Sequence, residues 1–114
     1  MASYFTFMKI IINNIPWKIK VIPASSEDLR RYNGTMTIGM TDANTNTIYI
    51  SKDLKGQIIY DVLCHELVHA YCFSYNIFMD IEDEEHMAQF ISEFGKEIVG
   101  STEQIIGNMV KYGF

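Results

Sequence analysis

Two of the three histidines in this chain lie four residues apart, and a glutamate follows the first of them. They are His65 and His69, with Glu66 between them, inside a stretch whose apolar spacing predicts a helix. Residues four apart on a helix project from the same face, so both imidazole rings can reach one tetrahedral Zn²⁺. Glu66 lies about 100° further round the helix. Its carboxylate can therefore take a proton from a metal-bound water without binding the metal itself.

A chance pair of histidines on a polar helix face would be the plain alternative, but the apolar periodicity around the motif argues against it. A catalytic zinc usually has three protein ligands and a water, so a third ligand must come from another segment. We predict Glu85, because it begins a helical pattern in which small Ala88 and polar Gln89 share its face. The open alternatives at neighbouring positions are His86, Glu84 and Glu82.

The excess of acidic over basic residues in the chain is concentrated beside this predicted ligand. The formal net charge is −5, and five of the 14 acidic residues lie in residues 80–85. The other nine are balanced by nine Lys and Arg, so the chain has no general basic surface for nucleic acid. An acidic run suits the first turn of a helix, where the positive end of the helix dipole favours negative charge.

The elements that must position these residues follow from changes of period along the chain. An apolar stretch at residues 8–12 and alternating stretches at residues 17–22, 35–40 and 47–51 predict four strands, the first two as a hairpin. The period then becomes helical, with one helix to residue 74, a loop at 75–80 and a second helix that starts in the acidic run. Gly100 is predicted to break this helix, and Ser101 to begin a last helix that ends near residue 110.

Strands first and helices after them predict an α+β fold. We expect a small mixed or antiparallel sheet of about four strands packed on the helix of His65, followed by a ligand helix and a C-terminal helix. The 114 residues match one domain, spanning residues 1–114. The sequence has neither a signal-peptide pattern nor an apolar run of the ~18 residues that cross a bilayer. We therefore predict a cytoplasmic protein without membrane contact.

Two sequence stretches resemble the ImmA/IrrE-type minimal gluzincin metallopeptidases. They are His65–His69 with the following Ala70, and Glu85-x-x-Ala88-Gln89-x-Ile91-Ser92. In that family the glutamate precedes a small residue by three positions and an Asn or Asp by four, where this chain has Gln89. The strand-turn-strand of residues 37–50 and the hairpin of residues 15–21 look most like small phage- and prophage-encoded members. The resemblance covers roughly residues 10–98.

The resemblance implies a zincin-like fold and a zinc-dependent metallopeptidase that hydrolyses peptide bonds in a specific protein substrate. His65, His69 and Glu85 would hold Zn²⁺, and Glu66 would act as the general base. The expected partner is a protein or peptide, such as a repressor-type regulator, and neither nucleic acid nor a membrane. The alternative is a zinc-binding regulatory or interaction module of a phage or mobile element, without protease activity.

Two further hypotheses concern the surroundings of the zinc. An extended peptide could add to a sheet edge formed by residues 47–51, which would bring its scissile bond over the metal. Asp61, four residues before His65, either orients that histidine or is a solvated acid at the start of the helix.

Overall fold

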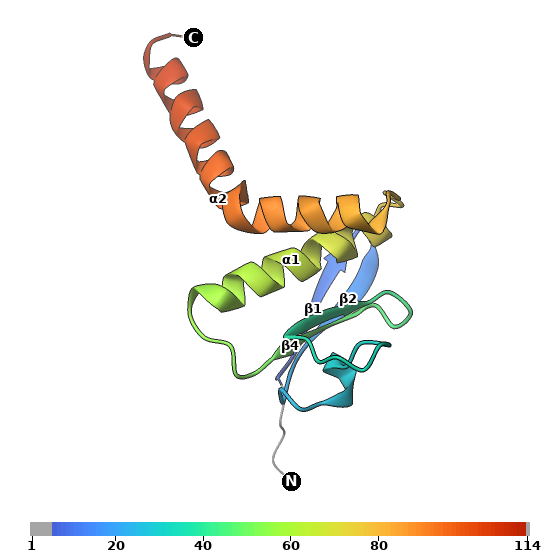
Figure 1. Cartoon of the computed structure of the whole chain (residues 1–114). Coiled ribbons are helices and arrows are strands. Elements are labelled where there is room, and N and C mark those ends of the chain that lie inside the picture. The colour runs from blue at the N-terminus through green and yellow to red at the C-terminus, as the bar shows by residue number, and fades with distance from the viewer. Residues whose placement is uncertain (1–5, 114) are drawn as a thin grey trace.

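The computed structural model describes residues 6–113 of the chain. Four strands come first and two helices follow, as the order of the sequence patterns predicts (Figure 1). The strands are β1 (Thr6–Ile12), β2 (Ile15–Ile22), β3 (Gly39–Asp42) and β4 (Thr47–Ser51). The helices are α1 (Gln57–Ser74) and α2 (Ile81–Lys111), and a short 3₁₀ helix, η1 (Glu27–Leu29), lies between β2 and β3. The molecule is therefore an α+β fold.

The sheet is mixed and has the strand order β1-β2-β4-β3. β1 is antiparallel to β2, β4 is parallel to β2, and β3 is antiparallel to β4. The prediction that residues 47–51 form a sheet edge is wrong, because β4 lies between β2 and β3. Ile48 and Ile50 are accordingly buried. Among the described strands, β3 is the edge on this side of the sheet.

The first hairpin follows directly from its sequence. Asn13 and Asn14 both have positive φ, 50° and 64°, which matches the twist of a tight two-residue hairpin turn. Along β2 the side chains of Trp17 and Ile19 are buried, while Lys18, which lies between them, is only partly buried. The predicted alternation is confirmed, and it directs the apolar face of the hairpin toward the core.

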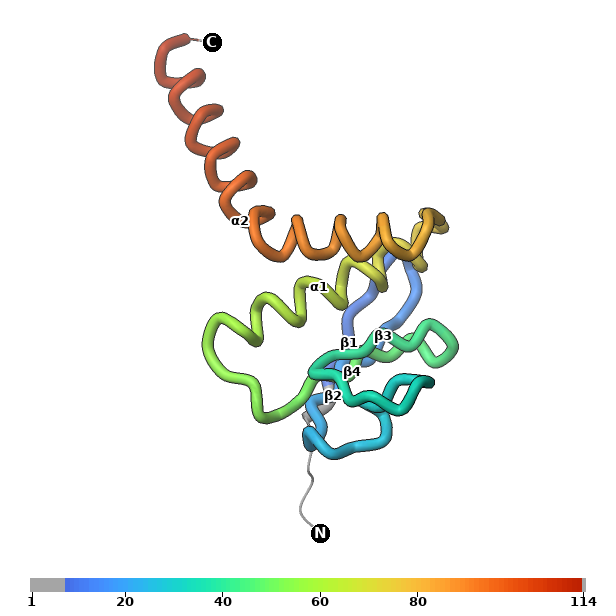
Figure 2. Tube along the Cα trace, in the orientation of Figure 1, coloured from blue at the N-terminus to red at the C-terminus, as the bar shows by residue number. Residues whose placement is uncertain are grey.

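The third strand begins later than its β-branched sequence predicts. Residues 30–38, called here the 30–38 loop, fold back on themselves before β3 begins (Figure 2). The Thr37 N–H donates to the Leu29 carbonyl over 2.8 Å, and Arg30 forms a β-bridge with Met36. These two contacts close the segment on itself. The Ile38 carbonyl accepts from the Ser51 N–H over 3.0 Å, and the paired register with β4 then runs from Gly39 to Asp42.

The molecule has three layers, the sheet, then α1, then α2. α1 contacts β1, β3 and β4, and α2 packs on α1 (Figure 1). The main core lies between the sheet and α1 and contains Ile12, Trp17, Ile19, Ile48, Ile50 and Ala70. A second, smaller cluster lies between the helices and contains Val68, Cys72 and Ala88.

The predicted break at Gly100 and the separate last helix are wrong, because α2 continues without interruption from Ile81 to Lys111. A glycine inside a helix costs only about 1 kcal/mol relative to alanine, which a long helix can tolerate. Figure 1 shows that α2 bends sharply at one place, and that the part after the bend extends away from the other elements. Neither helix has the length and apolar character needed to span a membrane, as far as the described residues go.

Candidate metal centre and groove

α1 carries the two motif histidines one turn apart, with 5.1 Å between their ring centroids. α2 brings Glu85 against both rings. Glu85 Oε1 lies 2.7 Å from His65 Nε2 and 3.0 Å from His69 Nε2. One ligand atom from each of the three side chains lies within 4.8 Å of the other two. The fold thus gathers at one point the three residues that the sequence predicts as metal ligands.

The donor set and its spacing fit a zinc ion. Two imidazole nitrogens and one carboxylate oxygen are a common set of protein ligands at a catalytic zinc. In a tetrahedral site with bonds of about 2.0–2.2 Å, the ligand atoms are about 3.3–3.5 Å apart. The Glu85 side chain is half exposed, at 50%, so it has room for the sub-ångström movement that this spacing requires.

Glu84 contacts the same histidine from the other side of its ring. Glu84 Oε2 lies 2.5 Å from His69 Nδ1, and only 18% of its side chain is exposed. A carboxylate in this position holds the ring nitrogen that does not bind metal, and so sets the orientation of the imidazole. The other candidates at neighbouring positions, Glu82 and His86, are exposed.

The side chains of Gln89 and Asp61 have partners within their own helices. The Gln89 side-chain amide donates to Glu93 over 2.6 Å, one turn further along α2. Asp61 accepts a hydrogen bond from Gln57 over 3.0 Å within α1. Within the described chain, therefore, His69 is contacted by Glu84 and not by Gln89. Asp61 fits the interpretation as an acid near the start of α1, rather than as a residue that orients His65.

Glu66 is held against the edge strand. Thr41 Oγ1 donates toward Glu66, with Oε1 at 2.7 Å and the Glu66 carbonyl oxygen at 3.0 Å. Gly39 makes this contact possible, since a Cβ there would lie 2.6 Å from Val62 Cγ1 and 3.2 Å from Glu66 Cγ. Without a side chain at position 39, β3 approaches α1 closely enough for Thr41 to hold one carboxylate oxygen and leave the other available.

The charges of the centre shift the pKa values of its members in opposite directions. Burial lowers the pKa of His69, but the hydrogen bond with Glu84 and the charges of Glu85 and Glu66 outweigh burial and raise it. Burial raises the pKa of Glu85, but its hydrogen bond with His65 and the charges of both histidines outweigh burial and lower it. The centre therefore stabilises positive charge beside Glu85, and a metal cation would take the place of the proton.

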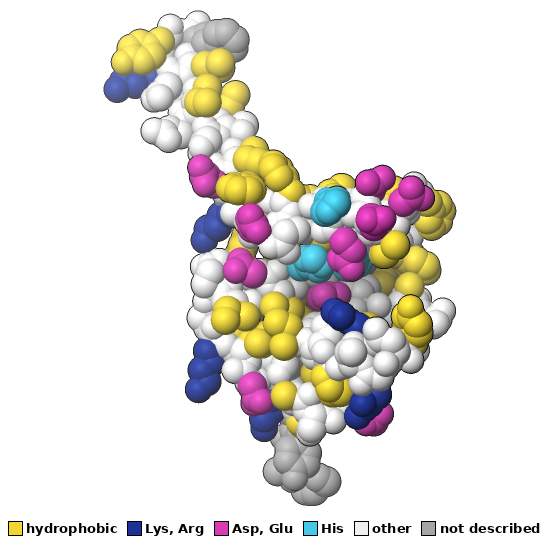
Figure 3. Space-filling model, in the orientation of Figure 1, with side chains coloured by type: hydrophobic (Ala, Val, Ile, Leu, Met, Phe, Trp, Pro, Cys, Tyr) yellow, Lys and Arg dark blue, Asp and Glu magenta, His cyan; other side chains and the backbone are white. Residues whose placement is uncertain are grey.

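The centre opens into two adjoining cavities. The first is about 350 Å³, and it joins the centre to an apolar end formed by Phe73, Ile77, Phe78 and Ile81. The second is about 220 Å³ and lies toward the start of α1, beside Asp61 and Val62. Both are lined by Arg31, Gly39, His65 and Glu66, and together they are called the groove. Figure 3 shows histidine and acidic side chains gathered on this face, with hydrophobic side chains beside them.

The positions of α1 and α2 depend on a small residue where they cross. Ala88 has no exposed surface and packs against Val68 and Cys72 of α1. A larger side chain there would push the helices apart, and Glu85 lies one turn before it on the same face. This is the small residue that the sequence pattern places on the ligand-bearing face.

Sequence reasoning missed three residues of the site. Thr41 and Arg31 carry no motif that would select them. Gly39 does carry a signal, since an isolated glycine among strand-forming residues is typical of a close backbone approach. The sequence offers Glu84 as an alternative ligand or as a solvated acid of the first helix turn, whereas its contact with the second ring nitrogen of His69 depends on the crossing of the helices.

Comparison of this chain with protein-family models, curated proteins and solved structures finds no match. What the site can do is therefore inferred from its own residues and their geometry.

Proposed function

We propose that this chain is a zinc-dependent metallopeptidase that hydrolyses peptide bonds in a protein substrate. The observation that carries the proposal is the convergence of His65, His69 and Glu85 beside Glu66 in an open groove. These three side chains would hold the zinc. When bound, zinc supplies a Lewis acid that polarises the peptide carbonyl and makes water more acidic.

Glu66 is the general base in this proposal. Its carboxylate takes a proton from the attacking water and passes it to the departing amine. The Thr41 hydroxyl holds one oxygen of that carboxylate, so the other keeps a fixed direction toward the groove. Glu84 keeps the His69 ring in the orientation that presents Nε2 to the metal.

The edge strand offers a place for the substrate backbone. β3 pairs with β4 along one side, and among the described strands nothing pairs with its other side. An extended peptide that adds to β3 would lie along the groove beside Glu66. The peptide-binding edge proposed here is thus β3 rather than residues 47–51.

A structural zinc in a regulatory module would normally be closed by four protein ligands. In the described part of the chain, the group that could hold a metal has three members, which favours the catalytic function. The substrate implied by the resemblance, a repressor-type regulator, stays a prediction.

Zinc content and peptide cleavage, measured on the same preparations, test the proposal. We expect the unaltered chain to bind one zinc and to cleave sequences in a peptide library. Glu66→Gln should keep the zinc and lose about 10²–10⁴-fold in cleavage rate. Glu85→Ala should lose zinc, whereas Glu82→Ala, altered at an exposed acid of the same helix turn, should behave as the unaltered chain.

Two results would contradict the proposal. One is full zinc content in Glu85→Ala, which would show that Glu85 is not the third ligand. The other is undiminished cleavage by Glu66→Gln, which would show that Glu66 is not the general base.

A further inference from the structure

The groove is chemically different at its two ends and at its centre. One end has the apolar side chains of Phe73, Ile77, Phe78 and Ile81, and the other lies beside Asp61 and Val62. The centre has the three predicted ligands, with the carboxylates of Glu66 and Glu84 beside them. Arg31 borders both cavities, next to Gly39 and Glu66. A peptide that passes through the groove would therefore meet Arg31 close to the bond that is cut.

Arg31 is the one Lys or Arg among the described residues that line the groove. Every other charged side chain there is acidic, namely Asp61, Glu66, Glu84 and Glu85. The Arg31 guanidinium donates to Thr37 Oγ1 over 3.3 Å, and within the described chain it forms no ion pair. Its neighbour Arg30 is paired with Glu27 at 2.9 Å. The two arginines thus have different partners.

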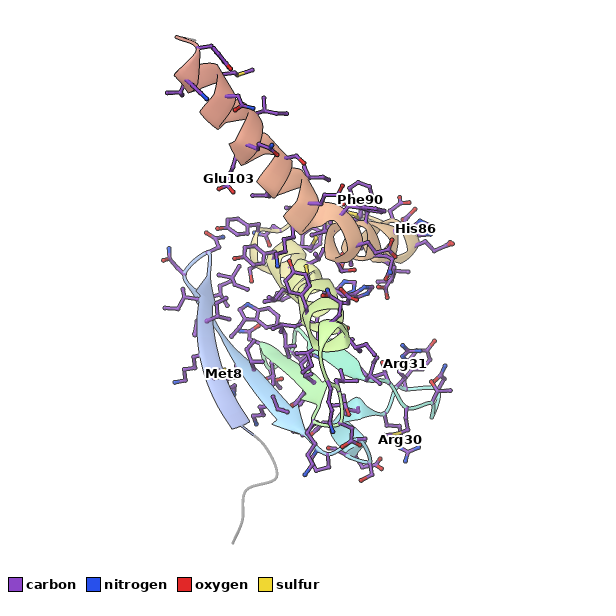
Figure 4. The ribbon with its side chains drawn as sticks, turned by 90° about the vertical axis from the view of Figure 1, so that its left-hand side faces the viewer. Met8, Arg30, Arg31, His86, Phe90 and Glu103 are labelled. Carbon is purple, nitrogen blue, oxygen red and sulfur yellow. The ribbon has the colours of Figure 1, made fainter. Side chains whose placement is uncertain are left out.

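The backbone at Arg31 is anchored rather than loose. The Arg31 N–H donates to the Thr35 carbonyl over 2.8 Å, and the Gly34 N–H donates to the Arg31 carbonyl over 2.8 Å. Asn33 Oδ1 accepts from both the N–H and the hydroxyl of Thr35. In Figure 4 Arg31 lies on the side of the 30–38 loop nearer to α1, and Arg30 lies farther from it. This loop therefore fixes the backbone position from which the Arg31 side chain reaches the groove.

We propose that Arg31 determines specificity by binding a carboxylate of the peptide substrate, next to the scissile bond; this inference rests on the proposed peptidase function. A guanidinium binds a carboxylate through two parallel hydrogen bonds, a geometry that a lysine does not reproduce. The acidic residues elsewhere in the groove repel negative charge, so a substrate carboxylate is accepted at Arg31 and disfavoured beside Glu84. The apolar end takes an apolar side chain of the same substrate.

The carboxylate has two possible sources, an acidic side chain or the C-terminus of the peptide. Hydroxamate tripeptides, which bind zinc through the hydroxamate, separate these sources and do not require cleavage. In the first set the hydroxamate replaces the C-terminal carboxylate, and in the second set it is at the N-terminus. In both sets the residue next to the hydroxamate is Glu, Gln or Lys. The probes of the second set are made with the C-terminus as a free acid or as an amide. Dissociation constants are measured on the zinc-loaded protein.

We expect, in one of the two sets, a carboxylate probe to bind about tenfold tighter than its neutral counterpart. Arg31→Gln should abolish this ratio, and Arg31→Lys should restore part of it. Arg30→Gln is the matched control and should keep the full ratio, because Arg30 lines neither cavity of the groove. The unfolding temperature of each variant shows whether the fold as a whole is intact.

The outcomes separate this inference from the proposed function. Equal binding of carboxylate and neutral probes by the unaltered chain, or a ratio that survives in Arg31→Gln, overturns the role of Arg31 and leaves the peptidase proposal standing. Equal weakening of every probe by Arg31→Gln also overturns specificity, since Arg31 would then act on the zinc-binding group. A zinc-loaded chain that binds no hydroxamate overturns the proposed function, and this inference with it.

Discussion

At the scale of single residues, the imidazole of His69 has a carboxylate at each nitrogen. Glu85 faces Nε2 at 3.0 Å, and Glu84 faces Nδ1 at 2.5 Å. Adjacent residues of one helix can do this because Glu84 is the more buried of the two, while Glu85 reaches across both histidine rings. In the proposed function, one glutamate would bind the metal and its neighbour would orient a metal ligand.

Substitution of Glu84 tests this division of roles. Glu84→Ala should weaken zinc binding about 10–100-fold, because His69 loses the group that fixes its ring. Glu84→Gln should have a smaller effect, since its amide oxygen still accepts a hydrogen bond from Nδ1–H. Competition with a chromophoric chelator measures the affinity, and Glu82→Ala serves as the control. If Glu84→Ala abolished zinc binding and Glu85→Ala did not, Glu84 would be the third ligand instead.

At the scale of elements, the contact between β3 and α1 depends on the absence of a side chain at Gly39. A Cβ at this position would lie 2.6 Å from Val62 Cγ1 and 3.3 Å from Glu66 Oε2. Either the edge strand or the helix would have to move. Glu66 lies at the contact between the two elements, so its position would change with them. The stability of the strand–helix contact and the placement of Glu66, the proposed general base, are therefore linked.

Gly39→Ala should destabilise the protein by about 1–3 kcal/mol, because it overfills this contact. It should also lower peptide cleavage, since Glu66 is displaced from Thr41. Gly100→Ala is the control, because a Cβ there meets nothing within 4 Å. In the helix interior it should stabilise by about 0.5–1 kcal/mol. Urea unfolding measures both, and a Gly39→Ala protein as stable as the original would show that the contact can relax.

At the scale of the whole molecule, one buried hydrogen bond ties the sheet to the end of α1. The indole N–H of Trp17, which has no exposed surface, donates to Ser74 Oγ over 2.8 Å. Asn13 of the hairpin turn donates to the Ser74 carbonyl over 2.9 Å. These contacts join residues about sixty positions apart in the chain, and they hold the end of α1 from which the loop to α2 departs.

Ser74→Ala should cost about 1–3 kcal/mol, because the Trp17 N–H is left buried without a partner. Ser92→Ala is a matched control at another buried serine, whose hydroxyl donates to Gln89 within its own helix over 2.9 Å. The control should lose less stability, since no other donor is left unpaired. Denaturant unfolding with a metal chelator present excludes any contribution from zinc. Equal losses in the two variants would contradict the special role of Ser74.

The sequence by itself determined those features that depend on short-range spacing. The one-turn separation of His65 and His69, the asparagine turn of the first hairpin and the alternation along β2 all follow from local backbone geometry. The run of acids before a helical pattern located the beginning of the second helix near its observed start at Ile81. The predicted helix break at Gly100 was wrong, because the unfavourable helix propensity of one glycine is small beside the cooperativity of a long helix.

The tertiary structure alone decided which groups meet across the fold. Strand order made β3 rather than β4 the edge, and strand order depends on contacts between distant segments. The crossing of α1 and α2 at Ala88 set which nitrogen of His69 faces Glu84 and which faces Glu85. The pairing of β3 with β4 and its contact with α1 brought the preceding 30–38 loop, and with it Arg31, to the groove. Such choices depend on packing between segments far apart in the chain, which residue spacing does not encode.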